Sequence, residues 1–112
     1  MNSSIIRLAG LSGAIAVAVG AYGSHVLRER VTDQRRLNAF QVGSRYHFFH
    51  TLALFGVAKA SYPLLSSVLF VSGMTVFCGT IYWYSICGNE YVRRFTPIGG
   101  VTLIVAWLTL VL

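Results

Sequence analysis

The sequence predicts an all-α fold: an integral membrane four-helix bundle, formed by a single domain over residues 1–112, with both termini on the same side. Composition is the first observation behind this prediction. Hydrophobic residues make up 55% of the 112 residues and charged residues only 11%, whereas an average soluble domain is about 25% charged. The mean hydropathy is +0.66. These values exclude an ordinary soluble globule, a disordered tail and a coiled coil, so lipid is the expected solvent.

Four apolar runs are the second observation, and they place the expected helices at about residues 5–27, 33–60, 64–87 and 97–112. All four runs are long enough to cross a bilayer core, which takes ~20 residues, and the fourth meets this length only narrowly. Backbone groups in lipid must be satisfied within their own segment, so each run is expected to be a helix. An even number of spans then places both termini on one side of the membrane.

Capping residues, prolines and a glycine support the boundaries of these runs. Side chains that accept hydrogen bonds from free amides precede the first, second and fourth runs. A proline marks the turn before the third run, another lies in the first turn of the fourth, and a glycine ends the third. The residues are Asn2, Ser3, Ser4, Thr32, Asp33, Pro63, Thr96, Pro97 and Gly88.

The distribution of positive charge predicts the orientation. The chain carries nine Lys and Arg against three Asp and Glu, a net charge of +6. Seven arginines lie in segments 28–45 and 88–96, at the junctions of the first run with the second and of the third with the fourth, whereas Arg7 and Lys59 lie on the opposite side. The positive-inside rule places segments 28–45 and 88–96 in a mitochondrial matrix or a bacterial cytoplasm, and the termini in the intermembrane space or periplasm. Nucleic acid is not an expected partner, because the basic residues form no domain separate from the apolar runs.

Most of these arginines are also candidate contacts for anionic lipid headgroups such as cardiolipin. The alternative is that they only set the topology. The candidate residues are Arg28, Arg30, Arg35, Arg36, Arg93 and Arg94.

The three histidines, with Arg45, form a candidate polar headgroup site. His47 and His50 are three residues apart and share a helix face, and His25 ends the first helix on the side where the second begins. We therefore expect all three to meet at one depth near the membrane boundary. Such a cluster would suit a metal ion, haem or a quinone headgroup. The alternative is that the histidines are interfacial, bonded to helix ends and lipid phosphates. The spacing matches no closed metal motif, so no metal or cofactor is assigned.

Small residues recur every four positions along the first run, which allows helices to approach closely in lipid. We expect these residues to pack against other helices of the same chain, with an oligomerisation seam as the alternative. They form two series, Gly10, Ala14 and Ala18, and Ala16, Gly20 and Ser24.

The carboxylates argue against an enzyme. Glu29, Asp33 and Glu90 all lie between the apolar runs, and no span carries an acidic residue. The chain also lacks the ordering of a catalytic triad, a nucleophile elbow and a phosphate loop. A non-enzymatic membrane protein is therefore expected.

Several motifs resemble the transmembrane protein 256 family over nearly the whole chain. They are LAGLSGA at 8–14, GAYGSH at 20–25, AFQVGSRYHFFHTLAL at 39–54, SG at 72–73, TVFC at 75–78, TPIGG at 96–100 and AW at 106–107. The resemblance implies a small four-helix membrane protein of bacterial membranes or animal mitochondria, in a family without an assigned activity. His25, Arg45 and His50 are the polar positions that fit the motifs best. Asp33 departs from the bacterial pattern, which has a proline there.

The resemblance is nearer to the animal branch at Phe77, Cys78 and His47, which favours the mitochondrial inner membrane over a bacterial plasma membrane. We expect an accessory or structural subunit of a larger assembly there, a respiratory complex or supercomplex. Two alternatives remain open. One is a protein that binds quinone, haem or lipid through the histidine cluster, and the other is a small oligomeric transporter.

Overall fold

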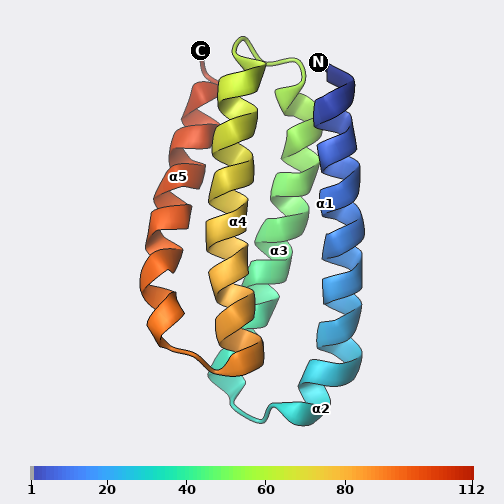
Figure 1. Ribbon diagram of the computed structural model, residues 1–112, viewed down its shortest axis with the longest axis vertical. Coiled ribbons are helices and arrows are strands. Elements are labelled where there is room, and N and C mark those ends of the chain that lie inside the picture. Colours follow the sequence, from blue (N-terminus) through green and yellow to red (C-terminus); the bar gives the residue numbers. More distant parts are fainter. Residues whose placement is uncertain (1) are drawn as a thin grey trace.

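The computed structural model describes residues 2–112, and this range contains helices and turns but no strand. These residues form four long helical rods. Figure 1 shows that the rods run alternately up and down, with both chain ends at the same end of the molecule. This arrangement confirms the predicted all-α four-helix architecture. The helices in chain order are α1 (Asn2–Tyr22), the π-helix η1 (Gly23–Leu27), α2 (Arg28–Arg30), α3 (Gln34–Val57), α4 (Pro63–Cys87), the 3-10 helix η2 (Tyr91–Phe95) and α5 (Thr96–Thr109).

Helix ends follow the capping signals, with small shifts. The Asp33 carboxylate accepts a hydrogen bond from the Arg35 amide at 3.0 Å and begins α3. Pro63 lies in the first turn of α4, and Gly88 ends that helix with a φ of 74°. A positive φ is easily adopted only without a Cβ, which explains glycine at this position.

Four predicted boundaries were wrong by three residues. The first helix begins at Asn2 and not at residue 5. The first rod is continuous through η1 and α2 to Arg30 instead of ending at residue 27. The α3 helix ends at Val57 and not at residue 60, because tight i to i+3 turns follow it and Tyr62 precedes a proline, which disfavours helical backbone. The α5 helix ends at Thr109, and only turns follow to residue 112.

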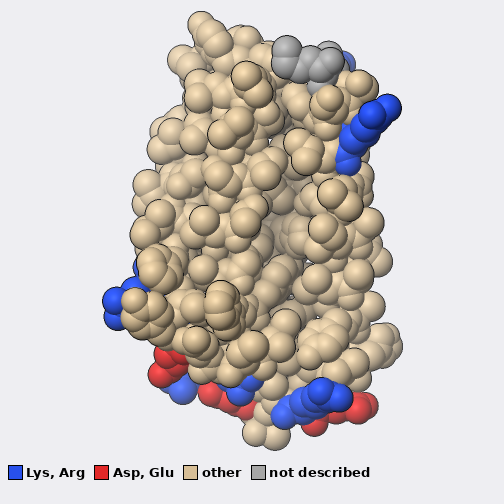
Figure 2. All heavy atoms as spheres, in the orientation of Figure 1, with Lys and Arg blue, Asp and Glu red and all other residues tan. Residues whose placement is uncertain are grey.

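Charge gathers at one end of the molecule. Figure 2 shows most charged side chains at the end opposite the termini, while the middle of the visible face carries none. We call this the basic end; it is formed by η1, α2, the start of α3, the end of α4 and η2. Two stretches, Ser3–Arg30 and Pro63–Cys87, are long and apolar enough to cross a membrane by length and composition. The α3 helix runs beside them with 24 residues, and the 14-residue α5 is the shortest rod.

The helices pack in sequence order: α1 packs along α3, α3 along α4, and α4 along α5. The principal extents of the Cα trace are 45, 26 and 15 Å. Because α1 has far fewer contacts with α4 than with α3, a furrow is left between α1 and α4.

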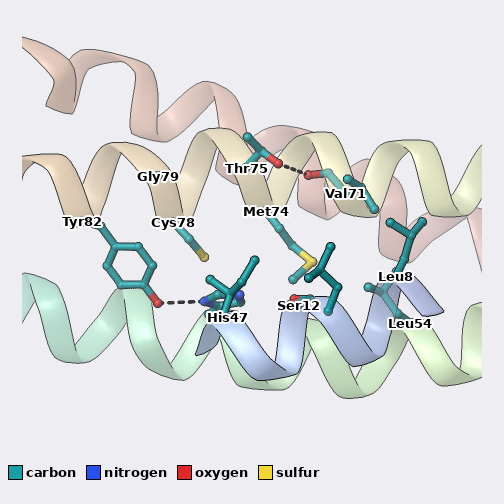
Figure 3. A pocket seen from close by; sticks show the side chains of 12 residues that line it. Leu8, Ser12, His47, Leu54, Val71, Met74, Thr75, Cys78, Gly79 and Tyr82 are labelled. Atoms are coloured by element: carbon teal, nitrogen blue, oxygen red, sulfur yellow. Dashed lines mark hydrogen bonds between the residues drawn. The ribbon is translucent and has the colours of Figure 1, made fainter. Parts of the chain in front are cut away.

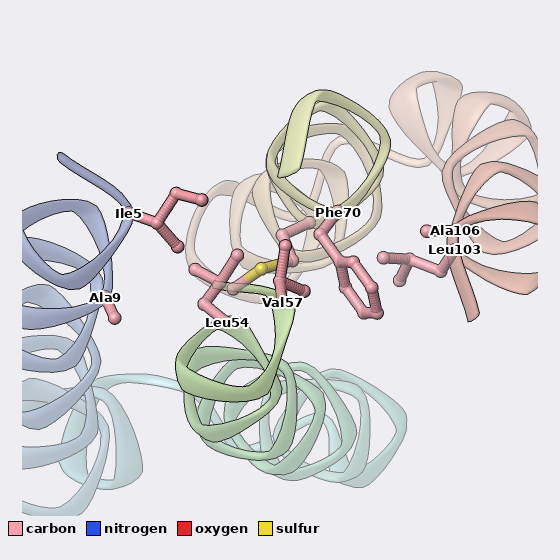
Figure 4. Packing of buried hydrophobic residues seen from close by; sticks show 8 residues of the cluster. Ile5, Ala9, Leu54, Val57, Phe70, Leu103 and Ala106 are labelled. Atoms are coloured by element: carbon pink, nitrogen blue, oxygen red, sulfur yellow. The ribbon is translucent and has the colours of Figure 1, made fainter. Parts of the chain in front are cut away.

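One hydrophobic core joins all four rods at the end of the bundle where the two chain termini lie. Figure 4 shows Ile5 and Ala9 of α1 facing the α3 side chains Leu54 and Val57. Phe70 lies between α3 and α5 in the same cluster and is fully buried. A smaller cluster of Leu27, Val31 and Phe40 lies at the basic end.

The α4–α5 seam is the closest contact between helices. A Cβ added to Gly99 would lie 2.5 Å from the Phe77 amide nitrogen, so the two backbones nearly touch. A Cβ added to Gly73 would lie 2.8 Å from the Leu103 side chain of α5 and 3.1 Å from its amide nitrogen. Two hydroxyl pairs join this seam near its ends, each at 2.6 Å. They are Ser66 with Thr109 and Thr80 with Thr96.

The small residues of α1 behave differently from the prediction. Gly10, Ala14 and Ala18 are exposed, and a Cβ on Gly10 would meet nothing within 4 Å. The prediction that this series packs within the chain was therefore wrong. The α1–α3 seam uses another face of the helix, which includes the buried residues Ala9 and Ala16.

Candidate functional site

The three histidines do not form a single cluster. His47 and His50 are both buried on α3, but their rings have different partners on different helices. His25 is exposed in η1 at the basic end and lines a different hollow from His47. Within residues 2–112, no group of three or more His, Cys, Asp or Glu side chains is placed to hold a metal ion. The prediction that all three histidines meet at one depth was wrong.

His50 is a structural residue with both ring nitrogens in use. Its Nδ1 lies 2.7 Å from the Tyr46 carbonyl oxygen, to which it donates. Its Nε2 accepts a hydrogen bond from the Trp107 indole at 3.0 Å. This bonding defines a neutral imidazole that links α3 to α5. His50 therefore has no nitrogen left to ligate haem.

His47 faces the furrow between α1 and α4. Its Nδ1 lies 3.0 Å from the Tyr82 hydroxyl of α4, and the main chain of Ser12 is the other polar neighbour of the ring. Figure 3 shows His47, Tyr82 and Cys78 around one cavity with Met74 and Leu54. The sequence alone gives no sign of this pairing, because His47 and Tyr82 lie 35 residues apart on different helices.

The cavity has a volume of about 390 Å³, and we call it the lateral groove. Such a volume lies at the lower end of the range for small-molecule sites, about 300–1,000 Å³. Its walls come from three helices: Leu8, Leu11, Ser12 and Ile15 of α1, His47 and Leu54 of α3, and Val71, Met74, Thr75, Cys78, Gly79 and Tyr82 of α4.

Most polar groups around the lateral groove are bonded within the protein. Ser12 pairs with Thr51 at 2.6 Å across the α1–α3 seam. Thr75 donates to the Val71 carbonyl, and the Cys78 thiol faces the Gly43 carbonyl at 3.6 Å. The His47–Tyr82 pair is therefore the main hydrogen-bonding feature of a cavity that is otherwise apolar.

The predicted lipid-binding arginines divide into two groups. Arg36 does not extend towards lipid, because its Nε and Nη2 donate to the carbonyls of Ser85 and Ile86 and bond the end of α4. Arg93 lies over the Tyr84 ring and Arg94 over the Tyr91 ring, with Cζ to centroid distances of 4.5 and 4.1 Å.

The other arginines of the basic end are exposed. The Arg35 Nη2 lies 3.6 Å from the Asp33 Oδ2. The hydrogen bond that the Arg35 backbone amide donates to the Asp33 carboxylate lowers the pKa of this carboxyl. Arg28 and Arg30 form no ion pair with any residue in 2–112. Arg45 is exposed on α3 and does not line the lateral groove.

Residues 19–100 match the family described as a protein of unknown function, DUF423. A UPF0382 membrane protein of Schizosaccharomyces pombe is 32% identical over 120 residues, covering 96% of this chain and 98% of that protein. YwdK of Bacillus subtilis, a UPF0382 membrane protein, is 33% identical over 113 residues, covering 95% and 91%. YgdD of Escherichia coli, a UPF0382 inner membrane protein, is 33% identical over 109 residues, covering 92% and 82%. No solved structure matches the chain.

These relatives are described as membrane proteins in bacteria and in a yeast, in agreement with the apolar rods and the basic end. The transmembrane protein 256 resemblance is compatible with this grouping. The chain belongs to the DUF423 family, among the UPF0382 membrane proteins.

Proposed function

We propose that this chain is a non-enzymatic membrane protein that binds a quinone-type ring in the lateral groove. The observation that carries the proposal is the part-buried His47–Tyr82 pair, with 3.0 Å between His47 Nδ1 and the Tyr82 hydroxyl, in a cavity whose other walls are mostly apolar. Small-molecule sites typically combine such walls with a few placed polar groups. The groove lies along α1 and α4, the two rods that are long and apolar enough to cross a membrane.

The pair suits both forms of a quinone. When His47 carries its proton on Nδ1, the ring donates to the Tyr82 oxygen, and the phenol proton is free to bond a quinone carbonyl. In the other tautomer Tyr82 donates to His47, and the phenol oxygen accepts from a quinol hydroxyl. Haem is a weaker candidate, because His50 is fully bonded and His25 lines a separate hollow.

Binding of ubiquinone-1 to the purified full chain in mild detergent tests the proposal. We expect Tyr82→Phe to weaken binding about tenfold. This factor corresponds to about 1.4 kcal/mol of binding free energy, near the upper end of the net contribution of one hydrogen bond. Tyr62→Phe is the matched control, since Tyr62 is exposed in the α3–α4 turn.

A second variant tests the groove without changing its hydrogen bonds. Gly79 lines the groove, and a Cβ there would meet nothing within 4 Å. The Gly79→Leu chain should therefore fold normally and lose ubiquinone-1 because its side chain fills the cavity. Wild-type binding no tighter than that of Gly79→Leu would overturn the proposal.

A second candidate function is that of a structural subunit in a larger membrane assembly. A respiratory complex or supercomplex of the mitochondrial inner membrane is the assembly that the sequence favours. The exposed face of Gly10, Ala14 and Ala18 favours this role, because small residues allow a partner helix to approach closely. A bacterial plasma membrane is the alternative location. The basic end would then lie on the matrix or cytoplasmic side.

Native electrophoresis of mildly solubilised membranes tests this second role. We expect the wild-type chain to migrate with a larger assembly and Ala14→Leu to release it. Val101→Leu, on the exposed face of α5, is the control. A wild-type chain that migrates alone at its own size would contradict the assembly role and leave quinone binding untouched.

A further inference from the structure

A second groove lies at the basic end, on the other side of the α1–α3 seam. Two adjoining hollows of about 380 and 360 Å³ share Gly23, Phe40 and Gln41, and together we call them the interfacial groove. Ile15 and Val17 flank the buried Ala16 on α1. Ile15 lines the lateral groove, whereas Val17 lines the interfacial groove. The two grooves therefore open on opposite sides of the seam.

The lining of the interfacial groove changes from polar to apolar along its length. Its outer part, at the end of the bundle, holds Arg28, Gln34 and Asn38. The middle part holds hydroxyl, imidazole and amide groups from Ser24, His25, Gln41 and Ser44. The part nearest the centre of the bundle holds Val17 and Phe48, which are 61% and 37% exposed. A molecule with a polar head and an apolar tail matches this gradient.

The π-helix η1 contributes to the shape of this groove. Gly23 packs so closely on the Phe40 ring that a Cβ there would overlap it, and this contact holds the rod against α3. The widened turn places Gly23, Ser24 and His25 along the groove wall. Single π-turns of this kind are frequent at functional sites.

Arg28 supplies the available cation. It lines the groove and forms no ion pair with any residue in 2–112. Arg36, by contrast, is bonded to the end of α4, and Arg35 lies against Asp33. An arginine without an acidic partner, beside hydroxyl and amide donors, is suited to a phosphate group.

We propose that the interfacial groove binds one anionic glycerophospholipid of the leaflet at the basic end. The Arg28 guanidinium donates to the phosphate. The hydroxyl groups of Ser24 and Ser44 and the amide group of Gln41 contact the phosphate and glycerol oxygens. An acyl chain lies along Val17 and Phe48. A free phosphate ion would use only the polar part, so the apolar continuation favours a lipid. This site uses different residues from the quinone site and does not rest on it.

Native mass spectrometry of the full chain tests the site, with dioleoyl phosphatidylglycerol as the probe. We expect Arg28→Gln to reduce the retained lipid about tenfold, as for the loss of one charge-assisted hydrogen bond. Arg30→Gln is the matched control, because Arg30 is two residues away, exposed, and outside the groove lining. Equal losses in the two variants would overturn the proposal in favour of unspecific charge attraction.

Ala21→Trp separates a lipid from a free anion. Ala21 is exposed and lines the apolar part, so tryptophan should block the acyl chain without removing charge or unfolding the protein. We expect Ala21→Trp to lose bound phosphatidylglycerol. In the wild type, we expect inorganic phosphate to compete poorly with the lipid. Full retention by Ala21→Trp, or equal competition by phosphate, would overturn the lipid assignment. Ubiquinone-1 binding should be unchanged in Arg28→Gln, so failure of this site is distinguishable from failure of the quinone site.

Discussion

The two outer helices are attached to the bundle in different ways. On one side, α5 is held to α4 by glycine contacts at Gly73 and Gly99 and by two hydroxyl pairs. On the other side, α1 itself contacts α3 with one hydroxyl pair among the described residues, Ser12 with Thr51, and the close glycine contact of this rod, Gly23 on the Phe40 ring, lies beyond the end of α1 in η1. Both grooves lie beside α1. Close packing therefore holds one side of the bundle together, and the looser side provides space for ligands.

The strongest test of this comparison is Gly99→Val. The new side chain would meet the Phe77 backbone at 2.5 and 2.8 Å, which α4 can relieve only by moving away from α5. We expect a loss of about 3 kcal/mol in the free energy of unfolding, the upper part of the usual range for overpacking. Denaturant unfolding in detergent micelles, followed by circular dichroism, measures it.

Gly10→Ala is the matched control on α1, because nothing lies within 4 Å of the new Cβ. It should be neutral or stabilise the protein by about 0.5–1 kcal/mol, as alanine is the better helix former. A loss at Gly10 as large as that at Gly99 would contradict the difference between the two sides.

His50→Phe should have the next largest effect. It removes both histidine hydrogen bonds and leaves the Trp107 indole N–H without its acceptor. We expect a loss of about 2 kcal/mol, because two hydrogen bonds are removed at a buried histidine, each with a usual contribution of about 1 kcal/mol. The same unfolding assay measures it.

His47→Phe sharpens the comparison. We expect this variant to lose less than half as much free energy of unfolding as His50→Phe, because the His47 ring lines a cavity. We also expect it to lose ubiquinone-1 binding. If the two histidine variants lost equal stability, the assignment of one structural and one ligand-binding histidine would be wrong.

The hydroxyl pairs allow a finer test. Ser66→Ala removes a fully buried partner of Thr109 from the α4–α5 seam. A loss of about 1 kcal/mol is expected, near the usual value for one hydrogen bond. Ser12→Ala removes the half-buried partner of Thr51 on the α1 side and should cost less. Double-mutant cycles with Thr109→Val and Thr51→Val isolate each pair energy.

The smallest effect concerns the start of α3. The Arg35 amide hydrogen bond lowers the pKa of Asp33 from its ordinary 3.8. A carboxyl with a lowered pKa in the folded state contributes its stabilisation above the unfolded value and loses it as the pH falls through the folded value. The wild type should therefore lose slightly more stability than Asp33→Asn below pH 3.8. Unfolding midpoints measured against pH check this, and parallel curves for the two proteins would contradict it.

The candidate site was predictable in part. His25 and His47 do line hollows, and Arg28 remains available for an anionic partner. The partners were not predictable, because Tyr82 and Trp107 lie 35 and 57 residues along the chain from the histidines that they bond. In the structure their polar atoms bond His47 and His50 across helix seams. Arg36 shows the same limit, since its acceptors are carbonyls about fifty residues away.

The sequence by itself determined the number of rods, their approximate ends, the shared side of the termini and the basic end. These properties depend on local signals: the length of apolar runs, capping residues, prolines and the position of arginines. Only the tertiary structure decided which face of α1 packs on α3, which histidine is structural and where the grooves open. The physical reason is that lipid and protein interior are both apolar. A membrane helix therefore shows little contrast between its faces, and packing partners are set by the fit of side chains brought together from distant helices.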